Sequence, residues 1–88
     1  ITVPLAPFWG TVGVAPAPVM GRQTTTAPHD HFGGNFDIKD LVAGSTLFLP
    51  VQVPGAMISL GDGHAVQGDG EVSLTAVETS LQGTITVQ

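Results

Sequence analysis

The sequence predicts an all-β domain, a small β-sandwich or barrel of five to six or more short strands with glycine-rich loops. Twelve glycines and seven prolines in 88 residues interrupt nearly every eleven-residue window, so no amphipathic helix of normal length fits before Glu71. Several segments alternate apolar and polar residues with a period of two, which is typical of strands. Turn-forming dipeptides separate these segments. Together these observations predict short strands and almost no helix.

The first half of the chain contains two predicted strands and one long connection. Phe8 to Ala15 alternates along its length and is the first predicted strand. Ala15 to Pro28 is a proline-punctuated connection with a threonine run, which we expect to be extended or mobile. Thr46 to Val53 is rich in β-branched and aromatic residues, and Pro50 predicts that this strand is at an edge or bulged.

The second half predicts three more strands around one loop. A turn at Pro54-Gly55 is followed by a short apolar strand from Ala56 to Leu60. Gly61 to Gly70 holds four glycines in ten residues and is interpreted as a loop. Glu71 to Thr79 and Leu81 to Val87 alternate again, so both are predicted strands.

The charge of the chain excludes several classes of function. Only 10% of the residues are charged, and two basic residues against seven acidic ones give a net charge of -5. A nucleic-acid partner is not expected, because no basic stripe could neutralise phosphates. Disorder is not expected either, since 42% of the residues are hydrophobic.

Hydropathy and cysteine content give further exclusions. No apolar run approaches the roughly 18 residues of a membrane span, and none resembles a signal peptide. We therefore expect no membrane association and a cytoplasmic location. The chain has no cysteine, so disulfides, thiolate zinc sites and thiol nucleophiles are excluded, although this alone does not fix the compartment.

The small size of the chain predicts that part of its surface is covered. A domain this short buries only about 60% of the surface that its unfolded chain exposes. Few charged side chains are available to face water. We expect either a homo-oligomer or missing flanking segments of a longer chain.

The ionisable residues gather in two glycine-rich loops. All three histidines and six of the seven acidic residues lie between His29 and Glu71. Histidine and carboxylate together suit a divalent cation, with zinc as the first expectation and calcium as the alternative. Glu71 could act as a general base and Asp69 could relay a proton. The candidate metal ligands are Asp37, Asp62, His64, His29 and His31.

Ordinary structural roles compete with this interpretation. Asp-Gly is a common turn dipeptide, and His29-Asp30-His31 is equally consistent with a solvated loop tip. Against that, the predicted strands Thr46 to Val53 and Ala56 to Leu60 would carry the chain out and back between the two loops. We therefore expect Asp37, Asp62 and His64 to converge beside Glu71.

Most of the chain, from about Pro7 to Glu78, resembles the acetamidase/formamidase family. The resemblance is specific, because long and unusual motifs occur in the family's order. These motifs are Phe8 to Pro16 (FWGTVGVAP), Gly33 to Leu41 (GGNFDIKDL), Ala43 to Leu47 (AGSTL), Leu49 to Val51 (LPV), Val53 to Ala56 (VPGA) and Gly61 to Val72 (GDGHAVQGDGEV).

The resemblance implies an all-β core and metal-assisted hydrolysis of formamide or acetamide to carboxylate and ammonia. Residues 1–88 would be a single β domain corresponding to the central part of a longer family chain. The first loop is longer than the compact Pro-His-Gly-Gly-Asn form of the family, so His29 and His31 both stay candidates for the family histidine. The implied site residues are Gly34, Asn35 and Asp37 in the first loop and Asp62, His64, Asp69 and Glu71 in the second, with Gly34 and Asn35 assigned to substrate binding.

Two other functions are compatible with the same residues. One is a truncated, non-catalytic β module that oligomerises or binds a metal. The other is a calcium-stabilised β domain, because aspartates in glycine-rich loops supply the oxygen ligands that calcium prefers. The histidines argue against calcium as the sole metal.

Overall fold

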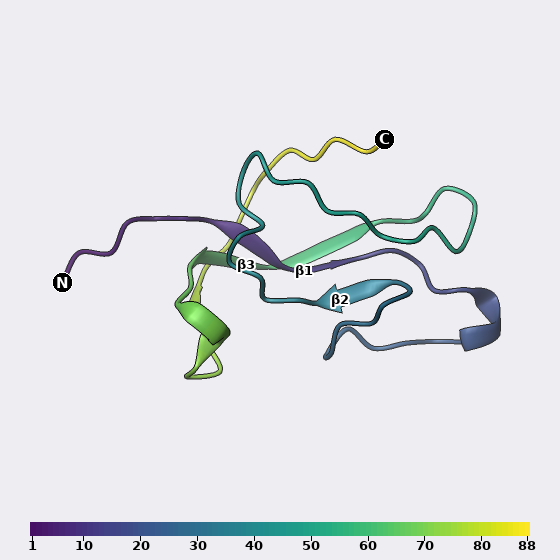
Figure 1. Cartoon of the computed structure of the whole chain (residues 1–88), viewed down its shortest axis with the longest axis horizontal. Coiled ribbons are helices and arrows are strands. Elements are labelled where there is room, and N and C mark those ends of the chain that lie inside the picture. Colours follow the sequence, from purple (N-terminus) through teal and green to yellow (C-terminus); the bar gives the residue numbers. More distant parts are fainter.

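One antiparallel sheet of four strands organises the chain (Figure 1). The structure is a computed structural model that describes all residues, 1–88. It confirms the predicted all-β class, since the helical elements are single 3-10 turns. No helix has the length and apolarity to cross a membrane. The spatial order of the strands is β2-β1-β3-β4. The elements are β1 (Phe8–Gly13), η1 (Pro18–Met20), β2 (Gly33–Asn35), β3 (Ser59–Val66), η2 (Asp69–Glu71) and β4 (Val77–Glu78).

β1 lies in the middle of the sheet and sets the positions of its neighbours. The predicted strand from Phe8 to Ala15 is thus confirmed in its first six residues. Alternate residues of β1 are buried, as the period of two predicts. Thr11 is paired with Asn35 of β2, and Phe8 is paired with His64 of β3. The two ends of β1 therefore define two separate regions of the molecule.

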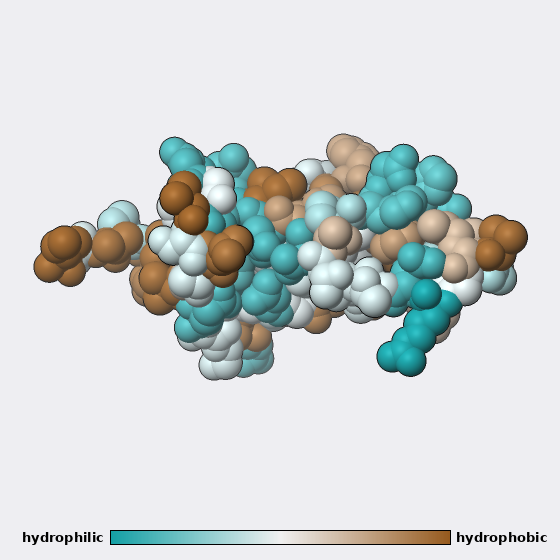
Figure 2. Space-filling view, turned by 90° about the horizontal axis from the view of Figure 1, so that it is seen from below, coloured by the Kyte–Doolittle hydropathy of each residue, from teal (hydrophilic) through white to brown (hydrophobic).

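The hydrophobic core is small. Only eight residues are buried, and the hydrophobic side chains among them are Phe8, Val12 and Phe32. The accessible surface of the chain is 6305 Å², whereas a compact monomer of 9.0 kDa exposes about 4,900 Å². Figure 2 shows hydrophobic side chains at the surface along the whole length of one face. The fold therefore leaves much apolar surface in contact with water.

The prediction of five to six strands in a sandwich or barrel is not confirmed, because the structure has four strands in a single antiparallel sheet. Thr46 to Val53 is not a strand, and neither is Leu81 to Val87. Both segments have β-forming residues but pair with no neighbouring strand, and side chains such as Phe48 stay exposed. β-propensity describes how a side chain fits a partly buried sheet surface, so it fails where no neighbouring strand is present.

Two predicted strands are also shorter than expected. Of Ala56 to Leu60 only the last two residues join β3, and of Glu71 to Thr79 only Val77–Glu78 forms a strand. The expected excursion out and back nevertheless occurs: in Figure 1 the segment between β2 and β3 runs away from the sheet, turns and returns into β3. Ala15 donates its N–H to the carbonyl of Ala56 at 2.9 Å, which ties the returning segment to the end of β1.

The prediction that Gly61 to Gly70 is a loop is wrong for its first six residues. They belong to β3, the longest strand. A Cβ atom at Gly63 would lie 2.6 Å from Leu81 Cβ and 2.6 Å from the Thr79 carbonyl oxygen. Glycine is therefore needed there for close packing and not for a turn. Glycine within a strand often marks such a close approach of another segment.

Candidate metal centre

The imidazole of His64 is the centre of a cluster of carboxylates. Its side chain is completely buried, and its Nε2 atom lies 3.3 Å from an oxygen of Asp62, 3.3 Å from one of Glu78 and 3.9 Å from one of Asp37. Glu71 completes the group, with a carboxylate oxygen within 4.8 Å of Asp37 and His64 ligand atoms. We call these five residues the His64 cluster: Asp37, Asp62, His64, Glu71 and Glu78.

The sheet brings most of these side chains together. Asp62 and His64 are two residues apart in β3, so their side chains lie on the same face. Glu78 of β4 is directly opposite His64 in the strand register. Asp37 follows β2, and its N–H donates to the Gly10 carbonyl at 3.0 Å, which holds it beside β1.

Gly10 leaves the space into which the cluster fits. A Cβ atom at this position would lie 2.7 Å from Asp37 Oδ1, 2.7 Å from Asp62 Oδ2 and 2.9 Å from His64 Cε1. Three candidate ligands therefore converge over Gly10, a position of β1 that has no side chain.

Two buried atoms of the cluster have no hydrogen-bond partner. They are Asp37 Oδ1 and His64 Nε2. Buried polar atoms without partners are rare in native proteins and each needs an explanation. Four carboxylates also meet here, while neither Lys39 nor Arg22 forms an ion pair with any of them. A divalent cation would supply both the missing partner and the missing positive charge.

The donor set fits zinc and also tolerates calcium. One imidazole nitrogen with carboxylate oxygens is a common zinc ligand set, and the Nε2–oxygen separations of 3.3 to 3.9 Å are those of ligands around one ion at about 2.0–2.2 Å. Calcium prefers oxygen atoms alone, so His64 favours zinc.

Side chains behind the cluster hold Asp37 in place. Asn35 donates from Nδ2 to Asp37 Oδ2 at 2.8 Å, and Thr11 donates from Oγ1 to Asn35 Oδ1 at 2.8 Å. Gln67 donates from Nε2 to the Asp37 carbonyl at 2.6 Å. Asn35 therefore lies beside the cluster, and its predicted role in substrate binding stays a prediction.

Three carboxylate residues of the cluster have a left-handed backbone. The φ angles are 48° at Asp37, 60° at Asp62 and 45° at Glu71. Only three other non-glycine residues of the chain have positive φ. Such conformations cost roughly 1–3 kcal/mol each and concentrate at functional sites. The backbone is therefore strained where the carboxylates converge.

The pKa of Glu71 is raised above its ordinary value. Its removal from water is the largest cause, and the negative charge of neighbouring Asp37 adds to it. A carboxyl whose pKa lies closer to neutrality is better suited to accept and return a proton.

His29 and His31 lie apart from the His64 cluster. His29 pairs with Gly33, which is opposite Gly13 at one end of β1, whereas His64 is opposite Phe8 at the other end. His29 Nδ1 lies 2.9 Å from an Asp30 oxygen, and the His29 ring stacks on Phe32 at a centroid distance of 4.5 Å. The structure therefore does not bring these two histidines together with Asp37, Asp62 and His64.

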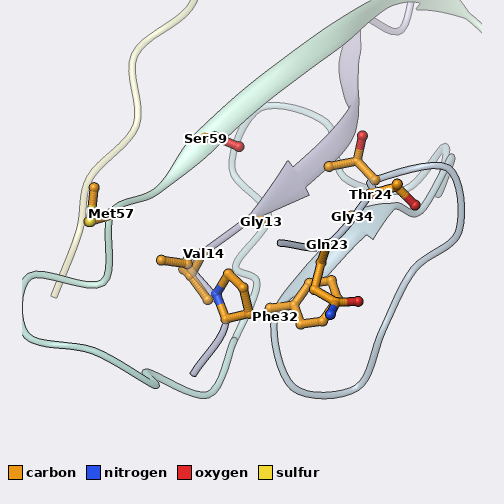
Figure 3. Close-up of a pocket in the computed structure, with 11 residues that line it drawn as sticks. Gly13, Val14, Gln23, Thr24, Phe32, Gly34, Met57 and Ser59 are labelled. Carbon is orange, nitrogen blue, oxygen red and sulfur yellow. The ribbon is translucent and has the colours of Figure 1, made fainter. Parts of the chain in front are cut away.

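Asp69 and Gly34 also lie outside the cluster. Asp69 is exposed and pairs with Lys39 at 2.5 Å. Gly34 lines an open cleft of about 200 Å³ beyond the end of β1 (Figure 3), which also includes Val14, Phe32 and Met57. None of the five cluster residues lines this cleft. The predicted catalytic role of Asp69 and substrate role of Gly34 have no support from these positions.

Sequence reasoning missed three residues around the site. In the sequence, Glu78 is only a polar position of an alternating segment. Local patterns do not predict the β3–β4 register that places it opposite His64. Thr11 and Gln67 act through hydrogen bonds that join distant parts of the chain. The grouping of acidic residues near His64 in sequence was the signal that could be used.

Comparison with known proteins gives one consistent result. The model of the acetamidase/formamidase family matches residues 6–88. The chain is 56% identical over 57 residues to a candidate formamidase of Schizosaccharomyces pombe, and 54% identical over 48 residues to an acetamidase of Mycolicibacterium smegmatis. It is 51% identical over 49 residues to a formamidase of Methylophilus methylotrophus. These matches cover 64%, 54% and 56% of the chain but only 13%, 12% and 12% of the respective relatives.

Proposed function

The chain belongs to the acetamidase/formamidase family, and we propose that its His64 cluster is the metal centre of a hydrolase that acts on small aliphatic amides. The names of its relatives support formamide and acetamide as substrates. The observation that carries the proposal is the convergence of an unpartnered buried imidazole nitrogen with carboxylates around the space over Gly10.

The reaction adds water across the amide C–N bond. A divalent cation, zinc in the first instance, would polarise the amide carbonyl and the attacking water. His64, Asp37, Asp62 and Glu78 would hold that cation. The water loses a proton as its oxygen bonds to the carbonyl carbon, the C–N bond breaks, and the nitrogen leaves as ammonia.

Glu71 is the proton carrier in this proposal. Its carboxylate lies beside the candidate ligands and its raised pKa suits a group that accepts the proton of water and returns it to the leaving nitrogen. Asp69 is exposed and paired with Lys39 at the surface, so this proposal assigns the proton transfer to Glu71 alone.

Association belongs to the same proposal. The large accessible surface and the exposed apolar side chains support a homo-oligomer or cover by further segments of the protein. The cytoplasmic location stays a prediction from the sequence, and cell fractionation tests it.

Ammonia release from formamide and acetamide tests the function. The chain loaded with Zn²⁺ is expected to release ammonia, and removal of the metal with a chelator is expected to stop the release. The same assay with calcium in place of zinc distinguishes an amide hydrolase from a calcium-stabilised β domain. Metal binding without any ammonia release would support the non-catalytic module instead.

A further inference from the structure

We propose that Gln67 is a positioning residue of the metal centre, which fixes the ring of His64 so that Nε2 faces the carboxylates. The inference rests on the proposed metal centre. Gln67 contacts two candidate ligand residues at once: its side chain bonds to the His64 ring and to the Asp37 backbone. No other side chain makes hydrogen bonds to two members of the cluster.

The first step is the orientation of the Gln67 amide. Its Nε2 donates to the carbonyl oxygen of Asp37 at 2.6 Å. A carbonyl oxygen only accepts, so the amide nitrogen must point toward Asp37. The amide oxygen Oε1 is then the atom that lies 2.9 Å from His64 Nδ1.

The second step is the proton on His64. Because Gln67 Oε1 only accepts, His64 Nδ1 must carry a hydrogen and donate it. This leaves Nε2 as the nitrogen that can offer a lone pair, and Nε2 is the atom close to Asp62, Glu78 and Asp37. Metal-ligating histidines generally have such a partner on the second ring nitrogen, which sets ring orientation and tautomer.

The third step is the rigidity of the arrangement. The His64 ring is completely buried and packs edge-on against Phe8 at a centroid distance of 4.9 Å. Phe8 has no polar atom, and Gln67 is the only hydrogen-bond partner of the His64 ring. The same amide ties Asp37, from the segment after β2, to the strand that carries His64. Gln67 therefore connects two of the three parts of the chain that supply the proposed ligands.

The test measures the affinity for Zn²⁺ by competition with a chelator. Gln67→Met keeps the length of the side chain and removes both hydrogen bonds, and we expect affinity to fall about 10- to 100-fold. Gln67→Glu keeps an acceptor for His64 Nδ1–H, and we expect affinity within a few-fold of the wild type. Gln82→Met is the matched control at an exposed glutamine whose side chain makes no hydrogen bond, and we expect no change.

Nitrogen-15 NMR of the zinc-loaded chain provides a readout that a merely structural role would not move. We expect Nε2 of His64 to be the coordinating nitrogen and Nδ1 to retain its proton in the wild type and in Gln67→Glu. Coordination through Nδ1 would overturn the inference, and so would equal losses of affinity in Gln67→Met and Gln67→Glu. Equal affinities of Gln67→Met and Gln82→Met would overturn it as well. A wild type that binds no Zn²⁺ would instead overturn the proposed metal centre itself.

Discussion

Gly10 shows how much of the site depends on one missing side chain. In the structure, the space where its Cβ would lie is bordered by Asp37, Asp62 and His64. Along the sequence Gly10 is only one position of an alternating strand, and nothing there indicates what it faces. Residue types near the cluster could be predicted, whereas the empty space between them could not.

Gly10→Ala is expected to reduce the affinity for Zn²⁺ at least tenfold. The added methyl group would lie within 3 Å of two carboxylate oxygens and would displace the ligands from a common point. We also expect overpacking to cost about 1–3 kcal/mol of unfolding free energy. Gly61→Ala in β3 is the control, because a Cβ there meets nothing within 4 Å. Equal Zn²⁺ affinities of the two variants would contradict the position assigned to the metal.

Two glutamates of the cluster are expected to differ in role. Glu78→Gln replaces a carboxylate whose oxygen is 3.3 Å from His64 Nε2, so we expect lower Zn²⁺ affinity. Glu71→Gln removes the proposed proton carrier, so we expect kcat for formamide to fall about 10²- to 10⁴-fold while the metal remains bound. Titration with Zn²⁺ and ammonia release, measured on both variants, check this division. Lower Zn²⁺ affinity in Glu71→Gln together with lower kcat in Glu78→Gln would exchange the roles assigned to the two glutamates.

At the scale of elements, one exposed ion pair joins two parts of the site. Lys39 follows Asp37 by two residues, and Asp69 begins η2, which contains Glu71. The hydrogen bond between them raises the pKa of Lys39 and lowers the pKa of Asp69. Both groups are exposed, so the stabilisation is small and is weakened by salt.

The pH dependence of this pair follows from the two directions. The lowered pKa of Asp69 gives stability that is present above the unfolded value, about 3.9, and is lost as the pH falls through the folded value. The raised pKa of Lys39 gives stability that is present below about 10.4 and is lost as the pH rises through the folded value. We therefore expect Lys39→Met to lower Tm between about pH 4 and pH 10 and to have less effect in stronger acid. Arg22→Met, at a base without an ion pair, is the control, and a pH-independent difference in Tm would contradict the account.

Prediction of the elements succeeded where the local residue pattern agreed with the tertiary environment and failed where a distant neighbour decided the structure. The alternation of Phe8 to Ala15 predicts β1 correctly. This strand lies between β2 and β3, and alternate residues of it are buried. The glycines of Gly61 to Gly70 resemble turn residues and predict a loop, although Gly63 lies in β3 and is required by the approach of Leu81. Thr46 to Val53 has strand composition without a neighbour to pair with. Pairing depends on residues far along the chain, which local patterns do not contain.

At the scale of the whole molecule, the exposed apolar surface predicts association. Phe48, Val72 and Leu74 are each about nine-tenths exposed, and the accessible surface exceeds that of a compact monomer of this mass. We expect sedimentation at micromolar concentration to show a species larger than 9.0 kDa. Phe48→Asp is expected to shift the distribution toward smaller species if that segment is part of the contact. A stable monomer across the concentration range would contradict this prediction.

The most direct test of the metal centre is an anomalous difference map at the zinc edge from crystals grown with Zn²⁺. We expect the main peak about 2.0–2.6 Å from His64 Nε2 and from carboxylate oxygens of Asp37, Asp62 or Glu78. The group formed by His29, Asp30 and His31 is an internal comparison in the same map, because it offers the same types of ligand at the surface. A main peak at that surface group, or no peak beside His64, would contradict the account.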